Sequence, residues 1–495
     1  MEPRKDTYLP LLKPLLDAPG SRYHLRDWDG RTPWQAQKYI TEGLLPNLQL
    51  SENTFREPAA PNDSLLIVVN ASSRSERRKP QTGLGHESHQ AIISFTNDIR
   101  TRSGFHAHGP VRMLLWVPEV EKQALLPRTV CHRRKIALAL EMTCQVEEIV
   151  GGASASVREL KQHREDFLNI ESGKQVAERM RRKNIQIPVE RQDGMQRKVQ
   201  DILQGSTSGD AVALRESDGT LPDNSREWHK ELRQLKADFE SGKLSQFIGG
   251  PPGVRTNKRR NDPRTHSPDW VRLMEMERNL KSQQREKIDV LHLIGEQEKL
   301  DSLELDAYQD GLSEAERREK LEEVDRRTRE LKTRLDNVTN RRSMAFKFIV
   351  DDRKAFVQNP PLLMWDQRTA EPLIAQDYNF YKPKDIALLD IQPRFPNPYP
   401  LTTAQAIYLD MIVARVFTHG NQTPTVGLKQ LAPGAFEALV PRVPALQDLR
   451  KGGCRNIEDL RCRVMTPEMF YNLALAWEKW PFKPPVPDLM YFNSS

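Results

Sequence analysis

The sequence has few cysteines, few hydrophobic residues and no long apolar run. Its four cysteines, at positions 131, 144, 454 and 462, include no CxxC pair. This excludes a disulfide framework and a zinc ribbon, and it favours a reducing compartment. No apolar run approaches the roughly 20 residues that a helix needs to span a bilayer, so we expect no membrane-spanning helix and no membrane partner.

Motifs that carry chemistry are also scarce. The sequence shows no P-loop, nucleophile triad or metal cluster. His86, Glu87 and His89 have a loose metal-like spacing, but the neighbouring glycine and serine favour an exposed loop. We therefore predict no bound metal.

Charged residues, in contrast, are abundant. They make up 29% of the 495 residues, against 37% hydrophobic residues, and the mean hydropathy is −0.68. Lys and Arg number 75 and Asp and Glu number 68, which gives a net charge of +7. The length suits two or three domains, and this modest surplus of cations favours a polyanionic partner only weakly.

The charge is concentrated in one region. Residues 151–358 contain 41 Lys and Arg and 38 Asp and Glu, which is 79 of the 143 charged residues in the chain. This region has a net charge of +3, and the rest of the chain has +4. We interpret residues 151–358 as a charged, partly disordered insertion within a compact fold. Net charge is therefore not the evidence for nucleic-acid binding.

The residues on either side of the insertion have an α/β pattern. Residues 65–69 are an unbroken apolar run, which is typical of a strand buried on both faces, and 111–117 and 386–391 are similar. Between the first two runs, residues 89–101 have one apolar helical face. This order predicts a parallel sheet built from residues 1–150, to which residues 359–398 return.

The insertion contains clear helix signals. Ser267 and Pro268 predict the start of a long helix that ends near residues 310–311, and Ser313 with Glu316 predicts a capping box for a second helix. In the second helix a mostly apolar set of residues recurs at alternating intervals of three and four, namely Leu321, Val324, Thr328, Leu331, Leu335 and Val338. This pattern predicts an antiparallel helical hairpin over about 267–345, with a dimerising coiled coil as the alternative.

The C-terminal part reads as helical. A proline-rich hinge at 393–400 precedes it, and Phe470, Leu473 and Trp477 then share one helical face. We predict a small all-helical domain over 399–480, followed by a tail, 481–495, without regular structure.

These landmarks occur in a familiar order. They are Gly109–Pro118, Ala124–Pro127, the basic His132–Lys135 and Glu478–Pro484. Together they resemble the mitochondrial transcription factor B family in its fungal form, a branch of the rRNA adenine N6-dimethyltransferases. The resemblance covers residues 1 to about 150 and about 360 to 495. It places Leu65–Ser72 at the fourth methyltransferase motif and Ile386–Pro393 at the last sheet strands.

The resemblance implies a Rossmann-like, class I S-adenosylmethionine methyltransferase fold. It also implies a specificity factor in the mitochondrial matrix that binds the single-subunit mitochondrial RNA polymerase and helps to recognise and melt promoter DNA. Residues 1–3 match the family's second strand, so the first strand, its glycine-rich turn and any presequence are missing from this chain. Either the gene model starts too late or the protein has lost half of its cofactor site. We expect the first, because the loss of a central strand would leave an unpaired sheet edge.

The same resemblance implies S-adenosylmethionine as a cofactor, with weak candidates for its site. Glu2 would bind the ribose hydroxyls, with an ordinary exposed acid as the alternative. Asp27 falls near the family's third motif, where an acid faces the adenine amine, but a turn aspartate is favoured. The glycine-rich turn that would cradle the cofactor has no counterpart here.

Asn70 is the candidate catalytic residue. In adenine N6-methyltransferases an Asn or Asp, a proline and an aromatic residue grip and stack the flipped base. Here Asn70 is followed by Ala71, Ser72 and Ser73, so the proline and the ring are missing. Because each stacking contact is worth on the order of 1–3 kcal/mol, efficient methyl transfer is disfavoured. The favoured interpretation is that Asn70 ends a strand and bonds its own loop.

Nucleic-acid contacts are predicted from basic clusters and from the tail. Two clusters can meet phosphates, namely Arg74, Arg77, Arg78 and Lys79, and Arg133, Arg134 and Lys135. Lys483 in the C-terminal signature, and Tyr491 and Phe492 in the tail, are further candidates, the last two for stacking on unpaired bases. The central runs, Arg179 to Lys183 and Lys258 to Arg260, are interpreted as solvated surface.

Three functional hypotheses remain. The first is a mitochondrial transcription specificity factor that acts by binding the polymerase and melted promoter DNA. The second is an active dimethyltransferase of the mitochondrial small-subunit rRNA. The third is a coiled-coil adaptor, in which the 267–345 fragment alone would bind the partner.

Overall fold

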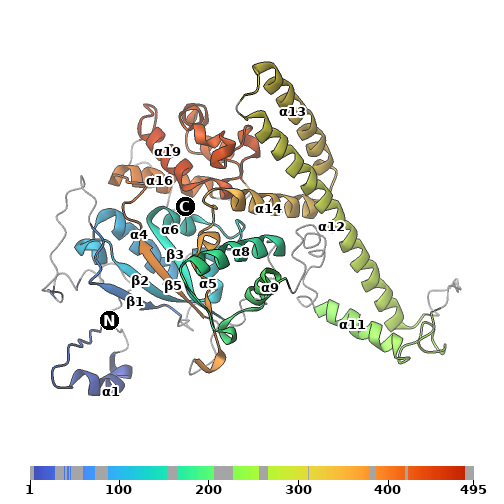
Figure 1. The fold of residues 1–495 in the computed structure, drawn as a ribbon, viewed down its shortest axis with the longest axis horizontal. Coiled ribbons are helices and arrows are strands. Elements are labelled where there is room, and N and C mark those ends of the chain that lie inside the picture. Colours follow the sequence, from blue (N-terminus) through green and yellow to red (C-terminus); the bar gives the residue numbers. More distant parts are fainter. Residues whose placement is uncertain are drawn as a thin grey trace. The chain divides into compact units, whose positions relative to one another are not determined.

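The fold was analysed in a computed structural model of the chain, shown in Figure 1. The structure describes residues 5–27, 38, 42–43, 45, 60–72, 87–152, 164–205, 227–255, 266–309, 311–379, 386–417 and 422–484. These residues form two compact units. The first draws on residues 1–155, 172–197 and 351–495, and the second on 156–171 and 198–350.

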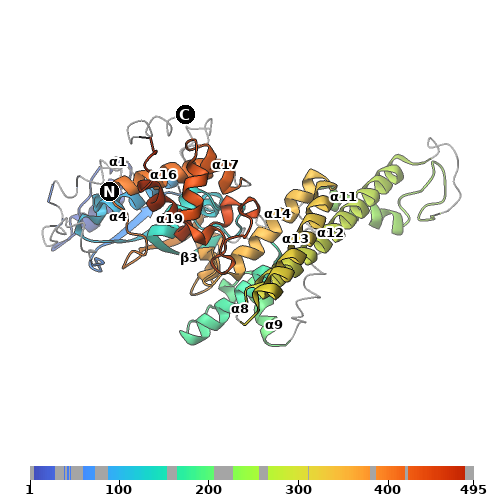
Figure 2. The ribbon, with the colours of Figure 1, turned by 90° about the horizontal axis from the view of Figure 1, so that it is seen from above.

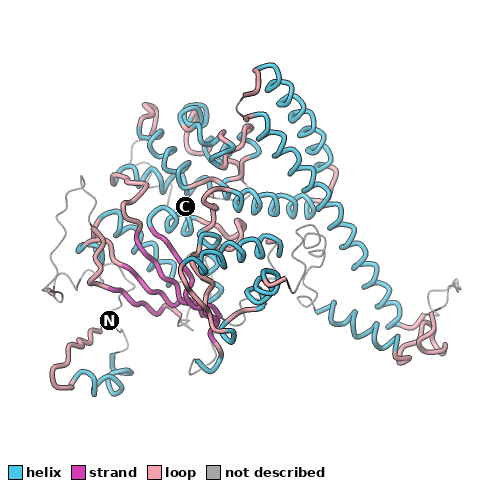
Figure 3. The backbone as a smooth tube through the Cα atoms, in the orientation of Figure 1, coloured by secondary structure: helices cyan, strands magenta, loops and turns pink. Residues whose placement is uncertain are grey.

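The first unit is built on a five-stranded mixed sheet, coloured as strands in Figure 3. The strands are β1 (Leu66–Asn70), β2 (Arg112–Pro118), β3 (Cys144–Gly152), β4 (Leu373–Ala375) and β5 (Ile386–Pro393), in the spatial order β1-β2-β5-β3-β4. β1 pairs with β2 in parallel and β3 with β4 in parallel, whereas β5 is antiparallel to both β2 and β3. The predicted α/β class is therefore confirmed, as is the parallel pairing of the first two strands. The prediction of a parallel sheet is wrong for β5, which runs antiparallel to both of its neighbours.

The prediction that residues 65–69 are buried on both faces is wrong. Side chains along β1 alternate, with Ile67 buried but Leu66 51% and Val68 63% exposed. β1 is an edge strand among the described residues, and its inner face alone packs against Ile92 and Phe95 in the sheet core. A strand with an unbroken apolar sequence can have one face or both faces packed against other elements. The sequence alone could therefore not distinguish these two cases.

Helices that flank the sheet complete its core. They are α4 (Glu87–Thr101), α5 (Glu119–Leu125), α6 (Lys135–Thr143) and the short α15 (Met364–Gln367). Leu125, Leu140 and Met364 from these helices share one apolar cluster with the inner residues of the strands. Short 3-10 turns occur at η1 (Gly104–His108), η2 (Val189–Arg191) and η4 (Asp377–Asn379). A separate helix, α1 (Lys5–Leu16), has no buried residue.

The C-terminal residues are helical, as predicted. They form α16 (Thr403–Val416), α17 (Pro424–Lys429), α18 (Ala435–Leu439), α19 (Pro467–Glu478) and the 3-10 turns η5 (Val440–Arg442), η6 (Pro444–Leu446), η7 (Leu449–Lys451), η8 (Ile457–Asp459) and η9 (Cys462–Val464). Figure 2 shows α16, α17 and α19 as one group. Phe470, Leu473 and Trp477 are fully buried in their core, which also includes Leu138 and Met142 of α6. The C-terminal helices therefore share a core with the sheet's own helices.

Two helices, α8 (Asp166–Arg182) and α9 (Gly194–Leu203), each contain residues of both units. Both lie in the stretch that the sequence assigned to the insertion. Residues 172–197 nevertheless group with the sheet in the first unit. The fold therefore assigns part of the charged region to the α/β unit.

The second unit is a set of helices, α11 (Glu227–Glu240), α12 (Pro268–Ala307), α13 (Glu314–Asp336) and the first part of α14 (Asn340–Val357). Ser267 caps α12 by accepting from Trp270 N, and Ser313 with Glu316 forms the predicted capping box of α13. α13 folds back along α12 (Figure 1), and Leu331 packs with Leu293 and Ile294. The predicted helical hairpin is present.

All four cysteines are free thiols, and three of them, Cys144, Cys454 and Cys462, are buried. Among the described residues, we found no helix with the length and apolar character needed to span a bilayer.

Candidate functional site

The Asn70 side chain is bonded within its own turn. Asn70 ends β1, and its Oδ1 accepts hydrogen bonds from Ser72 N at 3.0 Å and from Ser72 Oγ at 2.7 Å. A carboxamide oxygen that accepts from the backbone two residues later closes an Asx turn. The favoured interpretation from the sequence, a strand-end residue that bonds its own loop, is confirmed.

The basic cluster at 133–135 divides into one buried and two exposed residues. Arg133 is only 2% exposed and forks onto Glu141, with Nη2 2.6 Å from Oε2. Its Nη1 donates to the carbonyl oxygens of Arg463 at 2.9 Å and Met465 at 2.8 Å. Arg133 therefore cannot reach a phosphate, and its assignment as a nucleic-acid contact was wrong. Arg134 and Lys135 are exposed at the start of α6.

The remaining predicted residues that are described lie apart from one another. Lys483 Nζ donates to the carbonyl oxygens of Glu478 at 2.7 Å and Trp480 at 3.3 Å, so it satisfies the end of α19. Asp27 is exposed. Outside the described residues lie Glu2, Arg74, Arg77, Arg78, Lys79, His86, Lys258, Arg259, Arg260, Tyr491 and Phe492.

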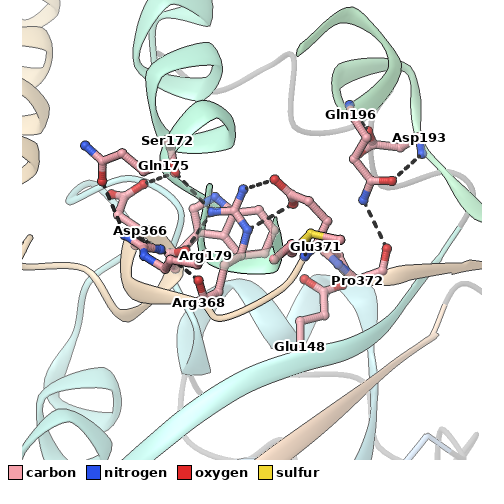
Figure 4. Close-up of polar contacts among 12 residues, drawn as sticks. Glu148, Ser172, Gln175, Arg179, Asp193, Gln196, Asp366, Arg368, Glu371 and Pro372 are labelled. Atoms are coloured by element: carbon pink, nitrogen blue, oxygen red, sulfur yellow. Dashed lines mark hydrogen bonds and ion pairs between the residues drawn. The ribbon is translucent and has the colours of Figure 1, made fainter. Parts of the chain in front are cut away.

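A buried polar network occurs instead where α8 meets the loop before β4 (Figure 4). Ser172 Oγ donates to Asp366 Oδ1 at 2.7 Å and accepts from Arg368 Nη1 at 3.0 Å. Arg368 also pairs with Glu371 through Nη2 at 2.7 Å. Arg179 Nη1 donates to the carbonyl oxygens of Asp366 at 2.9 Å and Arg368 at 2.7 Å. The network fixes α8 to the segment that leads into β4.

Trp365 joins this network to β3 of the sheet. Its ring lies between two guanidinium groups, with Arg128 Cζ 3.6 Å and Arg368 Cζ 3.8 Å from the ring centroid. Cations over an indole face are attracted by its quadrupole, at about 2 kcal/mol when desolvated. Arg128 Nη2 also lies 3.1 Å from Glu148 Oε2. The stack therefore connects β3 to α15.

An ion cluster continues from Glu148 to the start of α5. Lys122 Nζ lies 2.8 Å from Glu148 Oε1 and also contacts Glu119, and all three side chains are buried. Burial alone would raise the pKa of Glu148, but Lys122 and Arg128 outweigh it and hold that pKa below its ordinary value. Burial raises the pKa of Glu119 by more than Lys122 lowers it. Two carboxyls of different proton affinity thus share one ammonium group.

These buried polar groups hold segments of the chain together. The described cations of the network each bond a carboxylate or carbonyl of the protein, and Ser172 has an aspartate and an arginine as partners but no histidine. This leaves Ser172 without the imidazole base that would make it a nucleophile. Within the described ranges, no group of three His, Cys, Asp or Glu side chains is placed to hold a metal ion.

No pattern in the sequence predicted this network. Ser172, Asp366 and Arg368 lie in two segments almost 200 residues apart, and none belongs to a recognisable motif. The one available signal was Trp365, which follows the apolar Leu362–Met364 and precedes Asp366 and Arg368, because a large ring near charges often stacks on a guanidinium.

Comparison with known proteins gives no assignment. No protein-family model matches the chain, and neither a curated protein nor a solved structure matches it.

Proposed function

We propose that this chain is a mitochondrial transcription initiation factor of the transcription factor B type. It acts in the matrix by binding the single-subunit mitochondrial RNA polymerase and melted promoter DNA. The motif order in the sequence motivates the proposal, since Leu65–Ser72, Gly109–Pro118 and Ile386–Pro393 occur in the family's order.

The observation that best supports it is the position of β5 in the sheet. β5 is the last strand in the sequence, runs antiparallel, and lies between β2 and β3. The resemblance expects the last sheet strands at Ile386–Pro393, and β5 spans these residues. The three segments named by the resemblance fall on β1 with its turn, on β2, and on β5.

The turn after β1 supports binding without methyl transfer. The carboxamide oxygen that would grip an adenine amine accepts two hydrogen bonds from Ser72, and Asp27 is exposed. The Asn70 oxygen is thus engaged within its own turn, so the proposal includes no methyl transfer.

Promoter-dependent run-off transcription tests the proposal. The purified full-length chain is added to the cognate mitochondrial RNA polymerase on a linear promoter template and on a template with a scrambled promoter. We expect run-off product from the first template only when the chain is present. A parallel assay measures methyl transfer from S-adenosylmethionine to the small-subunit rRNA. Robust methylation combined with transcription that does not respond to the chain would instead establish the dimethyltransferase.

A further inference from the structure

Residues 172–197 are a strongly basic segment of the α/β unit. They contain seven Lys and Arg and three Asp and Glu, a net charge of +4 in 26 residues of a chain whose total is +7. From the sequence alone, Arg179 to Lys183 are interpreted as solvated surface. The fold shows that this segment is held against the β4 edge of the sheet.

The segment is anchored by side chains that point inward. Arg179 bonds the carbonyl oxygens of Asp366 and Arg368, and Gln196 Nε2 donates to the carbonyl oxygen of Pro372 at 3.0 Å. Figure 4 shows both anchors, one from α8 and one from α9. Because they hold both ends of the segment to the chain before β4, its outward side chains keep a defined position.

The outward side chains are cationic. Lys183 and Arg197 are exposed, and Arg181 and Arg182 are 74% and 71% exposed. These last two arginines share the single carboxylate of Glu178, so the pair keeps a positive charge. Exposed cations that are not neutralised are the groups that bind phosphates, through the release of counterions.

An exposed aromatic ring lies beside Arg191, a further cation of the same segment. Tyr378 of η4 lies three residues after the end of β4 and is 77% exposed, and Arg191 Cζ lies 5.8 Å from its ring centroid. Arg191 is itself fixed, since its Nη1 donates to Asn379 Oδ1 at 2.6 Å and to the carbonyl oxygen of Ile374 at 3.3 Å. Gln376 Nε2 donates to the carbonyl oxygen of Glu190 at 3.0 Å, which ties η4 to η2. The ring is therefore held outward on a braced turn.

We infer that these residues form a binding surface for an unpaired DNA strand. The surface, called the β4 surface below, consists of Arg181, Arg182, Lys183, Arg191, Arg197 and Tyr378. Cations beside an exposed aromatic ring are the elements that bind single strands, because phosphates pair with the cations and a base stacks on the ring. In duplex DNA the bases are already stacked, so the ring adds little there. The inference rests on the proposed function, in which such a strand arises at the melted promoter.

Fluorescence anisotropy with the full-length chain tests the β4 surface without polymerase. The probes are a labelled DNA oligonucleotide of about 20 nucleotides, the same sequence as a duplex, and its RNA equivalent. We expect Tyr378→Ala to weaken binding of single-stranded DNA by about 5-fold to 150-fold, the range for one lost stacking contact. Tyr378→Phe should bind within about twofold of the unmodified chain, because it keeps the ring. The matched control is Tyr23→Ala, which removes another exposed tyrosine.

The role of the cations of the β4 surface is tested by the salt dependence of single-stranded DNA binding. Lys183→Gln combined with Arg197→Gln should reduce the slope of log affinity against log salt by about 1.4, since each phosphate contact on a single strand contributes roughly 0.7. The inference is overturned if Tyr378→Ala binds as the unmodified chain does, if it weakens duplex and single-strand binding equally, or if only RNA depends on Tyr378. Run-off transcription by the unmodified chain is scored separately. A chain that fails in run-off but shows the Tyr378 effect refutes the proposed function and leaves the β4 surface standing.

Discussion

Asn70 and Ser72 are bonded twice at the end of β1, through the Ser72 backbone N–H and through its hydroxyl. This relationship gives the first prediction. Asn70→Ala should lower the free energy of unfolding by about 1 kcal/mol, because the turn loses its side-chain acceptor. Promoter-dependent run-off should be unchanged. Urea unfolding and run-off transcription measure the two effects. Loss of methylation in the same variant would contradict the structural role of Asn70 and restore its catalytic one.

The pairing of Arg133 with Glu141 gives the second prediction. Arg133→Met leaves Glu141 and the carbonyl oxygens of residues 463 and 465 buried without their donor. We expect a loss of about 3–5 kcal/mol in the free energy of unfolding. Arg134→Ala, one position along, should change it by less than about 0.5 kcal/mol, since that side chain is exposed. Urea unfolding compares the two variants. Equal stability would show that Arg133 is not the buried brace described here.

His106 gives a prediction about pH. Burial lowers the pKa of His106 to about 3, from an ordinary 6.5, and its Nδ1 accepts from Val111 N at 3.0 Å. The folded chain therefore holds the imidazole neutral while the unfolded chain protonates it below about pH 6.5. This contribution to stability is complete above pH 6.5 and is lost as the pH falls toward 3, at about 1.4 kcal/mol per pH unit.

His106→Asn removes this titration and keeps an acceptor near Val111. The difference in unfolding free energy between the unmodified chain and the variant is measured by urea titration at several pH values. At pH 7.5, where histidine is neutral in both states, the difference gives the cost that does not depend on pH. Below pH 6.5 the difference should shift in favour of the variant. A constant difference from pH 7.5 to 5 would show that the folded chain protonates His106 as readily as the unfolded chain does.

Gly151 lies where β3 passes the buried ion cluster. A Cβ added there would be 2.6 Å from Glu148 Oε1, an atom already bonded to Lys122. Because Lys122 and Arg128 both hold the carboxylate, it cannot move away cheaply, and Gly151→Ala should cost about 1–3 kcal/mol. Gly194→Ala is the control, since no atom lies within 4 Å of its added Cβ. Thermal unfolding of both variants measures the difference, and equal melting temperatures would refute a crowded Gly151.

Local signals in the sequence predicted local structure well. Ser267 and Ser313 start helices because caps depend on residues within one turn, and the predicted strands at 111–117 and 386–391 correspond to β2 and β5. β3 was not predicted because Gln145, Glu147 and Glu148 interrupt its apolar residues and two glycines end it. β4 is only three residues long, which is too short for any periodicity.

Long-range contacts were not predictable from the sequence. Arg133 resembles its exposed neighbour Arg134 in the sequence, and its carbonyl partners lie more than 300 residues away. Arg179 was placed with solvated charges for the same reason, although its guanidinium bonds the chain before β4. A run of charged residues in the sequence shows only which residue types are present. Whether one of their side chains is buried depends on which distant segment packs against it.

The place of β5 between β2 and β3 has a consequence for synthesis. Those two strands are complete by residue 152, but the strand that joins them begins at residue 386. During translation the ribosome must therefore make more than 200 further residues before the centre of the sheet can close. Until then β2 and β3 each expose an unpaired edge. Closing the sheet also costs conformational entropy, which grows with the length of the chain between β3 and β5. Exposed strand edges in a nascent chain are prone to aggregate. We therefore expect that synthesis of this protein depends on protection of β2 and β3 more than on the stability of the finished sheet.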